Sequence, residues 1–313
     1  MKLLVPTVIP ISIPPQPDVD IVFYDVTKEI PAEHHDARGA VFWLNPAEQV
    51  AGMAKALTKL EWAQGLMAGV DVLLAAGFSP DVKICAGVGL HDEPVAEHVV
   101  GLILAAARRL DIAVTAQNER RWPEELAGNQ TMDRTGFTTL AGAKVLIWGY
   151  GGIGEALAKK LQVFGAEVIG VKRTPEPGAL VQTVQPTEVA DILPTIDVLV
   201  SLLPGTRAAQ NTINAEVLGG LPQHAWFISA GRGSAVDEDA LVTALREGAI
   251  GGAALDVFAV EPLPNSSDLW DAPNLIMTPH SAGGRPRDPE KLIVENLRRL
   301  RNGEPLKGLV SES

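Results

Sequence analysis

The chain has 313 residues, enough for two domains of roughly 150 residues, each with a full hydrophobic core. Hydrophobic residues make up 46% and charged residues 20% of it, a composition that excludes wholesale disorder. The formal net charge is −12, and a surface this negative repels phosphate backbones, which argues against nucleic-acid binding.

Cysteine usage and the apolar runs predict a soluble, cytoplasmic protein. The single cysteine, Cys85, cannot form an internal disulfide, which fits a reducing compartment. The apolar run at residues 99–107 is far shorter than the about 20 residues that a membrane-spanning helix needs. The N-terminus superficially resembles a signal peptide. However, prolines at positions 6, 10, 14 and 15 interrupt any apolar helix there, so we expect a first buried strand and a proline-rich loop.

The first hundred residues alternate short apolar runs with helical spacing. They predict strands at residues 19–24, 40–44 and 82–85 and a helix at 46–60. This alternation of strand and helix is typical of a parallel sheet. Residues 94–110 then predict one long helix, which is buried because it is apolar on almost every side.

A polar stretch at residues 117–139 precedes a second α/β series. Helices are expected at residues 155–164 and 289–300. Strands are expected at residues 144–148, 167–172, 197–203, 225–229, 252–257 and 275–277.

A glycine-rich turn joins the first strand of this series to its helix. Its residues match the pattern Gly-x-Gly-x-x-Gly: Gly149, Tyr150, Gly151, Gly152, Ile153 and Gly154. The glycines permit a tight turn, approach of the backbone to a pyrophosphate, and close packing of helix on strand, while the amides at the helix N-terminus face the anion. A merely tight turn is the alternative, but the strand–turn–helix–strand context favours dinucleotide binding. Gly87-Val88-Gly89 lacks the third glycine, because Asp92 stands in its place.

The residues after the next strand bear on the choice of cofactor. An NAD site usually carries an acidic residue there to bind the ribose 2′-hydroxyl. This chain has Lys172, Arg173 and Thr174 instead. Two cations and a hydroxyl suit a 2′-phosphate, so NADP(H) is favoured over NAD(H). A solvated strand end would also tolerate these residues.

Three ionisable residues follow buried strands at sharp turns: Arg232, Glu261 and His280. In parallel sheets, ligands bind outside the carboxyl ends of strands, where these turns fall. Reduction of a 2-oxo acid requires a group that binds the carboxylate, a group that polarises the carbonyl, and an acid that protonates the carbonyl oxygen. Arg232 offers a permanent planar fork for the first two, and His280 titrates near neutrality and can donate the proton. Glu261 can fix the imidazole tautomer if the two are hydrogen-bonded.

The order of these motifs resembles the D-isomer-specific 2-hydroxyacid dehydrogenase family over about residues 60–300. The resemblance includes Ala68-Gly69-Val70-Asp71, Val95-Ala96-Glu97-His98, the glycine turn and the segment at residues 236–241. It assigns the same roles to the three ionisable residues. It also implies that backbone amides around Ala68 and Gly69 receive the substrate carboxylate.

The resemblance further implies a set of cofactor contacts. Asp256 is expected at the nicotinamide carboxamide, although a role in capping a helix or loop is comparably supported. Residues 203–206 match the turn that flanks the cofactor in the family, and Ala209 departs from the threonine that is usual there. Beyond the glycine turn and residues 172–174, the predicted cofactor-binding residues are Leu203, Pro204, Thr206, Ala230, Asp256, His280 and Ala282.

The remaining histidines and two aromatic residues have plainer interpretations. His98 is expected to pack or cap within its own helix. The other histidines show no metal-ligand spacing with one another or with Cys85, so we expect no metal site. Trp122 and Phe137 could shape a substrate pocket, but core or interface packing is the simpler interpretation.

Together these observations predict two α/β domains of parallel-sheet type, Rossmann-like and flavodoxin-like, around a cleft. The substrate-binding domain comprises residues 1–95 and 287–313, and the dinucleotide-binding domain residues 96–286. The expected activity is NADPH-dependent reduction of a small 2-oxo acid, such as glyoxylate or hydroxypyruvate, to the D-2-hydroxy acid. The resemblance implies a homodimer. Two alternatives stay open: a larger or aromatic 2-hydroxy acid as substrate, and a non-catalytic, dinucleotide-sensing corepressor.

Overall fold

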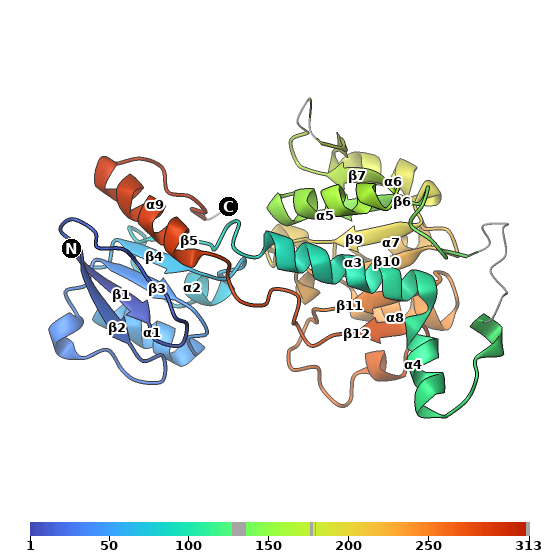
Figure 1. Ribbon diagram of the computed structural model, residues 1–313, viewed down its shortest axis with the longest axis horizontal. Helices are drawn as coiled ribbons and strands as arrows, with labels where there is room; N and C mark the ends of the chain where they lie inside the picture. Colours follow the sequence, from blue (N-terminus) through green and yellow to red (C-terminus); the bar gives the residue numbers. More distant parts are fainter. Residues whose placement is uncertain (127–135, 176–177, 179, 311–313) are drawn as a thin grey trace. The chain divides into compact units, whose positions relative to one another are not determined.

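The computed structural model describes residues 1–126, 136–175, 178 and 180–310 (Figure 1). The chain divides into two compact units. Met1–His91 and Arg285–Ser313 form the first unit, and Asp92–Gly284 forms the second. Each unit is built on its own parallel sheet.

The first unit contains a five-stranded parallel sheet in the order β2-β1-β3-β4-β5, the order of flavodoxin-like folds. Its strands are β1 (Lys2–Pro6), β2 (Asp20–Tyr24), β3 (Gly39–Phe42), β4 (Trp62–Gly65) and β5 (Lys83–Cys85). Strand β4 was not predicted. Its sequence, Trp-Ala-Gln-Gly, has no run of β-branched residues, and it forms a strand because β3 and β5 flank it on both sides.

Helices cover both faces of this sheet. Helices α1 (Ala47–Ala56) and α2 (Asp71–Ala75) pack on one face through Val50, Met53 and Leu73. Helix α9 (Pro289–Asn302) packs on the other face through Ile293 and Leu297. The helix expected at residues 46–60 ends earlier, at Ala56, because the chain must turn back to enter β4.

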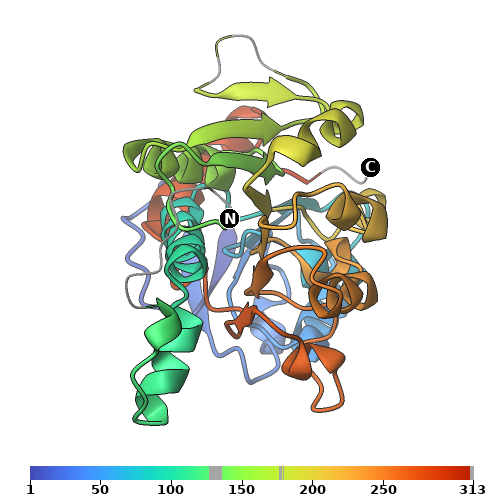
Figure 2. The ribbon, with the colours of Figure 1, turned by 90° about the vertical axis from the view of Figure 1, so that its right-hand side faces the viewer.

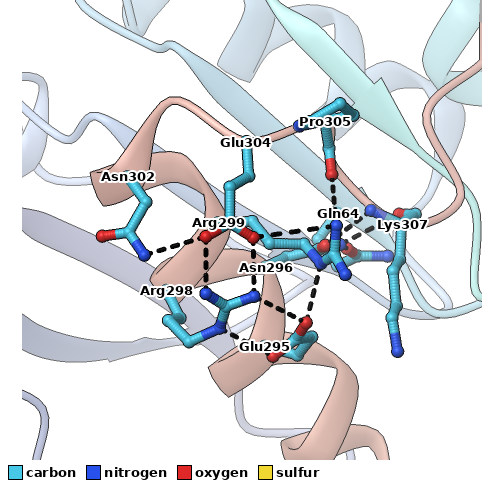
Figure 3. Close-up of polar contacts among 9 residues, drawn as sticks. All are labelled: Gln64, Glu295, Asn296, Arg298, Arg299, Asn302, Glu304, Pro305 and Lys307. Carbon is cyan, nitrogen blue, oxygen red and sulfur yellow. Dashed lines mark hydrogen bonds and ion pairs between the residues drawn. The ribbon is translucent and has the colours of Figure 1, made fainter.

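A buried amide network attaches the C-terminal segment to the first unit (Figure 3). The Asn296 side chain on α9 donates hydrogen bonds to Gln64 Oε1 on β4 at 2.7 Å and to the Lys307 carbonyl at 3.0 Å. It also accepts the Lys307 N–H at 2.8 Å. Both amide side chains are fully buried, so these bonds satisfy groups that would otherwise be costly to bury.

The second unit contains a seven-stranded parallel sheet in the order β12-β11-β10-β9-β6-β7-β8. Its strands are β6 (Lys144–Trp148), β7 (Glu167–Val171), β8 (Gln182–Val184), β9 (Val198–Ser201), β10 (Trp226–Ser229), β11 (Gly252–Leu255) and β12 (Leu275–Met277). From β6 the chain builds outward first through β7 and β8, and then in the other direction through β9. This doubly wound order places a topological switch point between β6 and β9. The unpredicted β8 is a short edge strand with polar residues at its first two positions.

Alternate strand residues build two cores, one on each face. Helices α3 (Asp92–Arg108) and α5 (Gly152–Val163) cover one face, together with Phe137, which is buried in that core. Helices α6 (Val189–Ile192), α7 (Ala215–Gly219) and α8 (Glu238–Arg246) follow the strands that line the other core. The packing interpretation of Phe137 is therefore confirmed.

The single helix expected at residues 94–110 is interrupted. Arg109 adopts a left-handed backbone conformation (φ 48°), so α3 ends at Arg108 and a new helix, α4 (Leu110–Asn118), begins. Helix α4 extends away from the sheet of this unit (Figure 2). Trp122 follows it and is 78% exposed.

Among the residues that the structure describes, no helix combines the length and apolar character needed to cross a bilayer. Within the same residues, no three His, Cys, Asp or Glu side chains converge as metal ligands would.

Candidate active site

The strand order of the second unit places the candidate residues in a row along one edge of its sheet. All strands are parallel, so their carboxyl ends share this edge. Following the sheet from β12 to β7, the residues that come after each strand are His280, Glu261 with Asp256, Arg232, Leu203, Gly149 and Lys172.

The glycines of the turn after β6 differ in what surrounds them. Gly149 has φ 99°, and a Cβ on it would lie 2.6 Å from the Leu202 carbonyl oxygen. Gly151, the N-cap of α5, faces open space. A Cβ on Gly154 would lie 3.2 Å from the Tyr150 ring, so this position serves helix–strand packing. Gly149 therefore permits the tight turn, Gly151 leaves room for a ligand to approach the backbone, and Gly154 permits close packing of the helix on the strand. A dinucleotide-binding turn requires all three properties.

Gly152 serves a further contact that the motif does not specify. A Cβ there would collide with the carboxylate of Asp92, at the start of α3. The absence of a side chain lets that carboxylate approach the N-terminus of α5, where the helix dipole favours negative charge.

Tyr150 lies differently from its neighbours in the turn. Its ring packs against Gly170 of β7, where any side chain would collide with it, and its N–H donates to the Val171 carbonyl at 3.1 Å. Its hydroxyl is buried without a hydrogen-bond partner among the described residues, and burial raises the pKa of this phenol. The structure thus places the Tyr150 side chain in the core between β6 and β7.

Lys172, Arg173 and Thr174 follow β7. Lys172 is half-buried and its N–H donates to the Val184 carbonyl at 3.0 Å, while Arg173 and Thr174 are exposed. Glu155 on α5 lies nearby. Its hydrogen bond from Lys159 lowers its pKa, and the positive charge of Lys172 lowers it further. The end of β7 therefore carries two cationic residues, Lys172 and Arg173, with the Glu155 carboxylate close to Lys172.

Glu261 and His280 form a hydrogen-bonded pair. His280 Nδ1 lies 2.6 Å from Glu261 Oε2, and Glu261 Oε1 accepts the Phe258 N–H at 2.9 Å. An ionised carboxylate accepts only, so Nδ1 carries the proton and Nε2 is the ring atom available for chemistry. The His280 side chain is 46% exposed, which leaves this atom accessible.

Arg232 stands between two glycines that are both crowded by backbone. A Cβ on Gly231 would lie 2.5 Å from the Leu203 carbonyl oxygen, and one on Gly233 would overlap the carbonyl group of Phe258. The loop of Arg232 therefore packs backbone to backbone against the loop that carries Glu261. Glu238, on α8, stabilises the latter by accepting the Ala259 N–H at 2.7 Å.

Asp256 caps the loop that carries His280. Its buried carboxylate accepts hydrogen bonds from Thr278 Oγ1 (2.6 Å) and from the amides of Ser281 (2.9 Å) and Ala282 (3.0 Å). The capping role expected as one of two possibilities is thus present. Ala282 is buried, and the Ala230 N–H donates to the Ser201 carbonyl at 3.1 Å, whereas Pro204 and Thr206 are exposed.

The prediction for His98 is wrong. Its ring forms its hydrogen bond outside α3. His98 Nε2 lies 3.0 Å from Thr278 Oγ1 and 3.3 Å from Asp256 Oδ1. No local pattern indicates these contacts, because the partners of His98 are 158 and 180 residues further along the chain.

Ala68 and Gly69 lie in the first unit, in the loop after β4, where Ala68 is exposed. Gly87 supports that loop: its N–H donates to the Met67 carbonyl at 2.7 Å, and a Cβ there would collide with the Leu66 carbonyl. His91 Nε2 also lies 2.7 Å from the Leu66 carbonyl oxygen. The glycine that failed the phosphate-binding pattern thus has a structural role here.

Comparisons with known proteins identify the family to which this site belongs. Residues 100–282, more than half of the chain, match the model of the D-isomer specific 2-hydroxyacid dehydrogenase NAD binding domain. The chain belongs to the D-isomer specific 2-hydroxyacid dehydrogenases. This dehydrogenase is an NAD(P)-dependent oxidoreductase.

Individual relatives extend the match over nearly the whole chain. It is 32% identical over 287 residues to glyoxylate/hydroxypyruvate reductase A of Escherichia fergusonii, covering 89% of this chain and 87% of that protein. The structure of a D-isomer specific 2-hydroxyacid dehydrogenase from Xanthobacter autotrophicus Py2, in complex with NADPH and MES, is 34% identical. The match has a TM-score of 0.79 and covers 94% of this chain and 90% of that one.

A second solved structure is the NADPH-dependent glyoxylate/hydroxypyruvate reductase of Sinorhizobium meliloti in complex with NADP and malonate. It is 28% identical, with a TM-score of 0.72, and the match covers 100% of this chain and 99% of that one. Both similar structures therefore have two parallel-sheet α/β domains like those of the dehydrogenase described here.

Proposed function

We propose that this dehydrogenase reduces a small 2-oxo acid of the glyoxylate or hydroxypyruvate type to the D-2-hydroxy acid, with NADPH as the preferred hydride donor. The observation that carries the proposal is the pairing of His280 with Glu261 at 2.6 Å, in a loop packed beside the loop of Arg232. This combination supplies an acid–base group and a fixed cation at one sheet edge.

His280 acts as the general acid. Glu261 orients the ring through Nδ1, so Nε2 faces away from the pair and delivers a proton to the carbonyl oxygen during reduction and takes it back in the reverse direction. Glu261 can hold this orientation because its second oxygen is bound to the Phe258 amide.

Arg232 holds the substrate carboxylate and polarises the carbonyl group that is reduced. Its guanidinium keeps its charge at every relevant pH, and its planar fork matches a carboxylate. Two glycines that tolerate no side chain hold its backbone in place, which limits where the fork can lie. Ala68 and Gly69, in the exposed loop after β4 of the first unit, are proposed as substrate-binding residues through their backbone amides.

The residues present fit a nicotinamide dinucleotide. Gly151 leaves open space at the N-terminus of α5, where backbone amides can receive a pyrophosphate. Lys172, Arg173 and Thr174 would hold a 2′-phosphate, and the turn at Leu203, Pro204 and Thr206 would flank the cofactor. The bound cofactor supplies the hydride. Two similar structures contain NADPH or NADP, which supports this preference.

The substrate class rests on charge. A phosphorylated acid would need additional cations beside the loop at Ala68 and Gly69, and residues 64–74 contain no lysine or arginine. A small uncharged substituent on the oxo acid is therefore favoured. Two relatives named above, both glyoxylate/hydroxypyruvate reductases, point to the same class.

The test is oxidation of NADPH and NADH by the purified protein across 2-oxo acids from glyoxylate to phenylpyruvate. Rapid NADPH oxidation with glyoxylate or hydroxypyruvate is the expected result. Preference for NADH would overturn the cofactor assignment, and preference for phenylpyruvate would overturn the substrate class. Binding of dinucleotide without turnover of any acid would favour a sensor instead of an enzyme.

A matched pair of variants tests the 2′-phosphate contact. K172A/R173A should raise the KM for NADPH at least about 10-fold while leaving the KM for NADH unchanged, because only NADPH carries the extra charge. K159A, on the adjacent α5, removes one exposed lysine and should leave both values unchanged.

A further inference from the structure

The backbone of His280 is held in an unusual conformation. Its φ is 49°, in the left-handed region that non-glycine residues seldom adopt. Its N–H is bound to the Asp256 carbonyl at 2.8 Å and to the Thr278 carbonyl at 3.0 Å. Such a conformation persists only where the surrounding structure enforces it. The direction of the imidazole therefore depends on what holds the loop on both sides of His280.

The Asp256 carboxylate holds the loop on both sides. Thr278, two residues before the histidine, donates to Oδ1, and Ser281 and Ala282, just after it, donate to Oδ1 and Oδ2. This side chain is 1% exposed, so water does not replace these bonds. Each of its hydrogen bonds is charge-assisted, which makes them stronger than bonds between neutral groups.

His98 reaches this network from outside the loop. Its Nε2 lies 3.0 Å from Thr278 Oγ1 and 3.3 Å from Asp256 Oδ1. The Thr278 hydroxyl has a single proton, which it donates in a hydrogen bond to Asp256 Oδ1 at an oxygen–oxygen distance of 2.6 Å. Thr278 can therefore only accept from His98, so His98 must carry a proton on Nε2. The chain of donors runs from α3 through Thr278 to the carboxylate.

We propose that His98 and Thr278 are positioning residues for the acid–base histidine, acting through the Asp256 carboxylate. This inference rests on the proposed role of His280. The donor on α3 fixes the Thr278 hydroxyl, the hydroxyl and the two amides fix the carboxylate, and the carboxylate fixes the backbone on either side of His280. Loss of the α3 donor releases the loop, and Nε2 of His280 is then no longer aligned with the carbonyl oxygen. Neither residue takes part in the proton transfer itself.

Steady-state kinetics of paired variants tests the proposal. H98L removes the donor and should lower kcat about 10- to 100-fold, because catalysis is sensitive to misplacement of a reacting group by about 1 Å. The Kd for NADPH, measured by fluorescence titration, should stay within twofold. H98Q places an N–H at similar reach and should retain most of kcat. T278V should resemble H98L, and T278S should resemble the wild type.

A matched control separates positioning from general destabilisation. His224 also pairs with an aspartate of the same unit, Asp197, at 2.8 Å, and the His224 side chain is 27% exposed, against 23% for His98. H224L therefore makes the same substitution in a pair of the same residue types, away from His280. Its kcat should equal that of the wild type. If H224L loses as much activity as H98L, the effect of H98L is general and the proposal is overturned.

A readout without turnover keeps this inference separate from the proposed function. Ring-nitrogen NMR signals of His280 in the free protein, assigned with H280A, should shift or broaden in H98L but not in H98Q or H224L. Unchanged signals in H98L, or unchanged kcat, overturn the positioning role. If the wild-type protein turns over no 2-oxo acid, the proposed function fails, and the NMR comparison alone decides whether His98 positions His280.

Discussion

Two histidine–aspartate pairs lie at opposite edges of the sheet in the second unit. At the amino edge, His224 pairs with Asp197, whose other oxygen accepts the Lys144 N–H at 2.7 Å. At the carboxyl edge, His98 contacts Asp256, whose carboxylate also accepts from a hydroxyl and two amides of one loop. The first carboxylate is 26% exposed and the second 1%.

The difference shows that the residue types in a pair do not define its role. At the amino edge, a carboxylate in contact with water joins the starts of two strands, and solvent can replace either bond. At the carboxyl edge, a buried carboxylate holds a loop in a left-handed conformation that carries an exposed, ionisable ring. Low accessibility makes its hydrogen bonds harder to replace, so geometry is enforced there. Four substitutions test this comparison.

The largest effect is expected for H280A. Removal of the general acid should lower kcat about 10²- to 10⁴-fold, the usual contribution of such a group. Dinucleotide affinity should change far less than kcat, because the glycine turn and the end of β7 are intact and His280 is one of many predicted cofactor contacts. A variant that keeps full activity would show that the acid–base assignment is wrong. Steady-state kinetics and a dinucleotide titration make the measurement.

Gly233→Ala should disturb both loops at the carboxyl edge. Its Cβ would overlap the Phe258 carbonyl, so the loops of Arg232 and Glu261 must separate. We expect about 100-fold lower kcat/KM and roughly 3 kcal/mol lower stability in chemical denaturation. Gly101→Ala is the control, since a Cβ there on α3 meets nothing within 4 Å, and it should be neutral or stabilising by up to about 1 kcal/mol. Equal behaviour of both variants would contradict the crowding argument.

D256N should show a pH-dependent loss of stability. Burial raises the pKa of Asp256, but the hydrogen bonds from His98, Thr278 and two amides outweigh it, so the pKa lies below its ordinary value. A group whose pKa is lowered by folding stabilises the protein above its unfolded pKa, about 3.9, and this contribution disappears as pH falls through the folded pKa.

At pH 7 we therefore expect the free energy of unfolding of D256N to be about 2 kcal/mol lower than that of the wild type. The Asn side chain keeps one accepting oxygen, but its NH2 group cannot accept the hydrogen bond that the second carboxylate oxygen accepts. Urea denaturation from pH 7 downward should show the two proteins converging below about pH 4. A constant difference over this range would mean that the ionised carboxylate contributes nothing.

The smallest effect is expected for H224L at the amino edge. Loss of one partly exposed histidine–aspartate contact should lower the free energy of unfolding by about 1 kcal/mol or less and leave kcat within twofold. Thermal unfolding and steady-state kinetics test both values. A large loss of activity in H224L would contradict the conclusion that only the pair at the carboxyl edge affects catalysis.

The sequence by itself determined the class of the fold and the family. Alternating strand and helix periods predict parallel sheets, and the turn at Gly149, Gly151 and Gly154 is recognisable because each glycine answers a local backbone requirement. Arg232, Glu261 and His280 could be named because each follows a strand in a parallel sheet, so topology brings them to one edge. Local periodicity was insufficient for β4 and β8, which are strands because of their neighbours, and for the break at Arg109.

Only the tertiary structure decided which distant side chains form hydrogen bonds with one another. His98 and Thr278 are 180 residues apart, and no spacing rule relates a helix position to a hydroxyl beyond a distant strand. Likewise, the interpretation of Gly87 changed when the Leu66 carbonyl was found against it, and the Tyr150 side chain proved to lie against Gly170. Periodicity reports which face of an element is buried. Hydrogen bonds between distant elements depend on positions of a few tenths of an ångström, which arise only when the cores have packed.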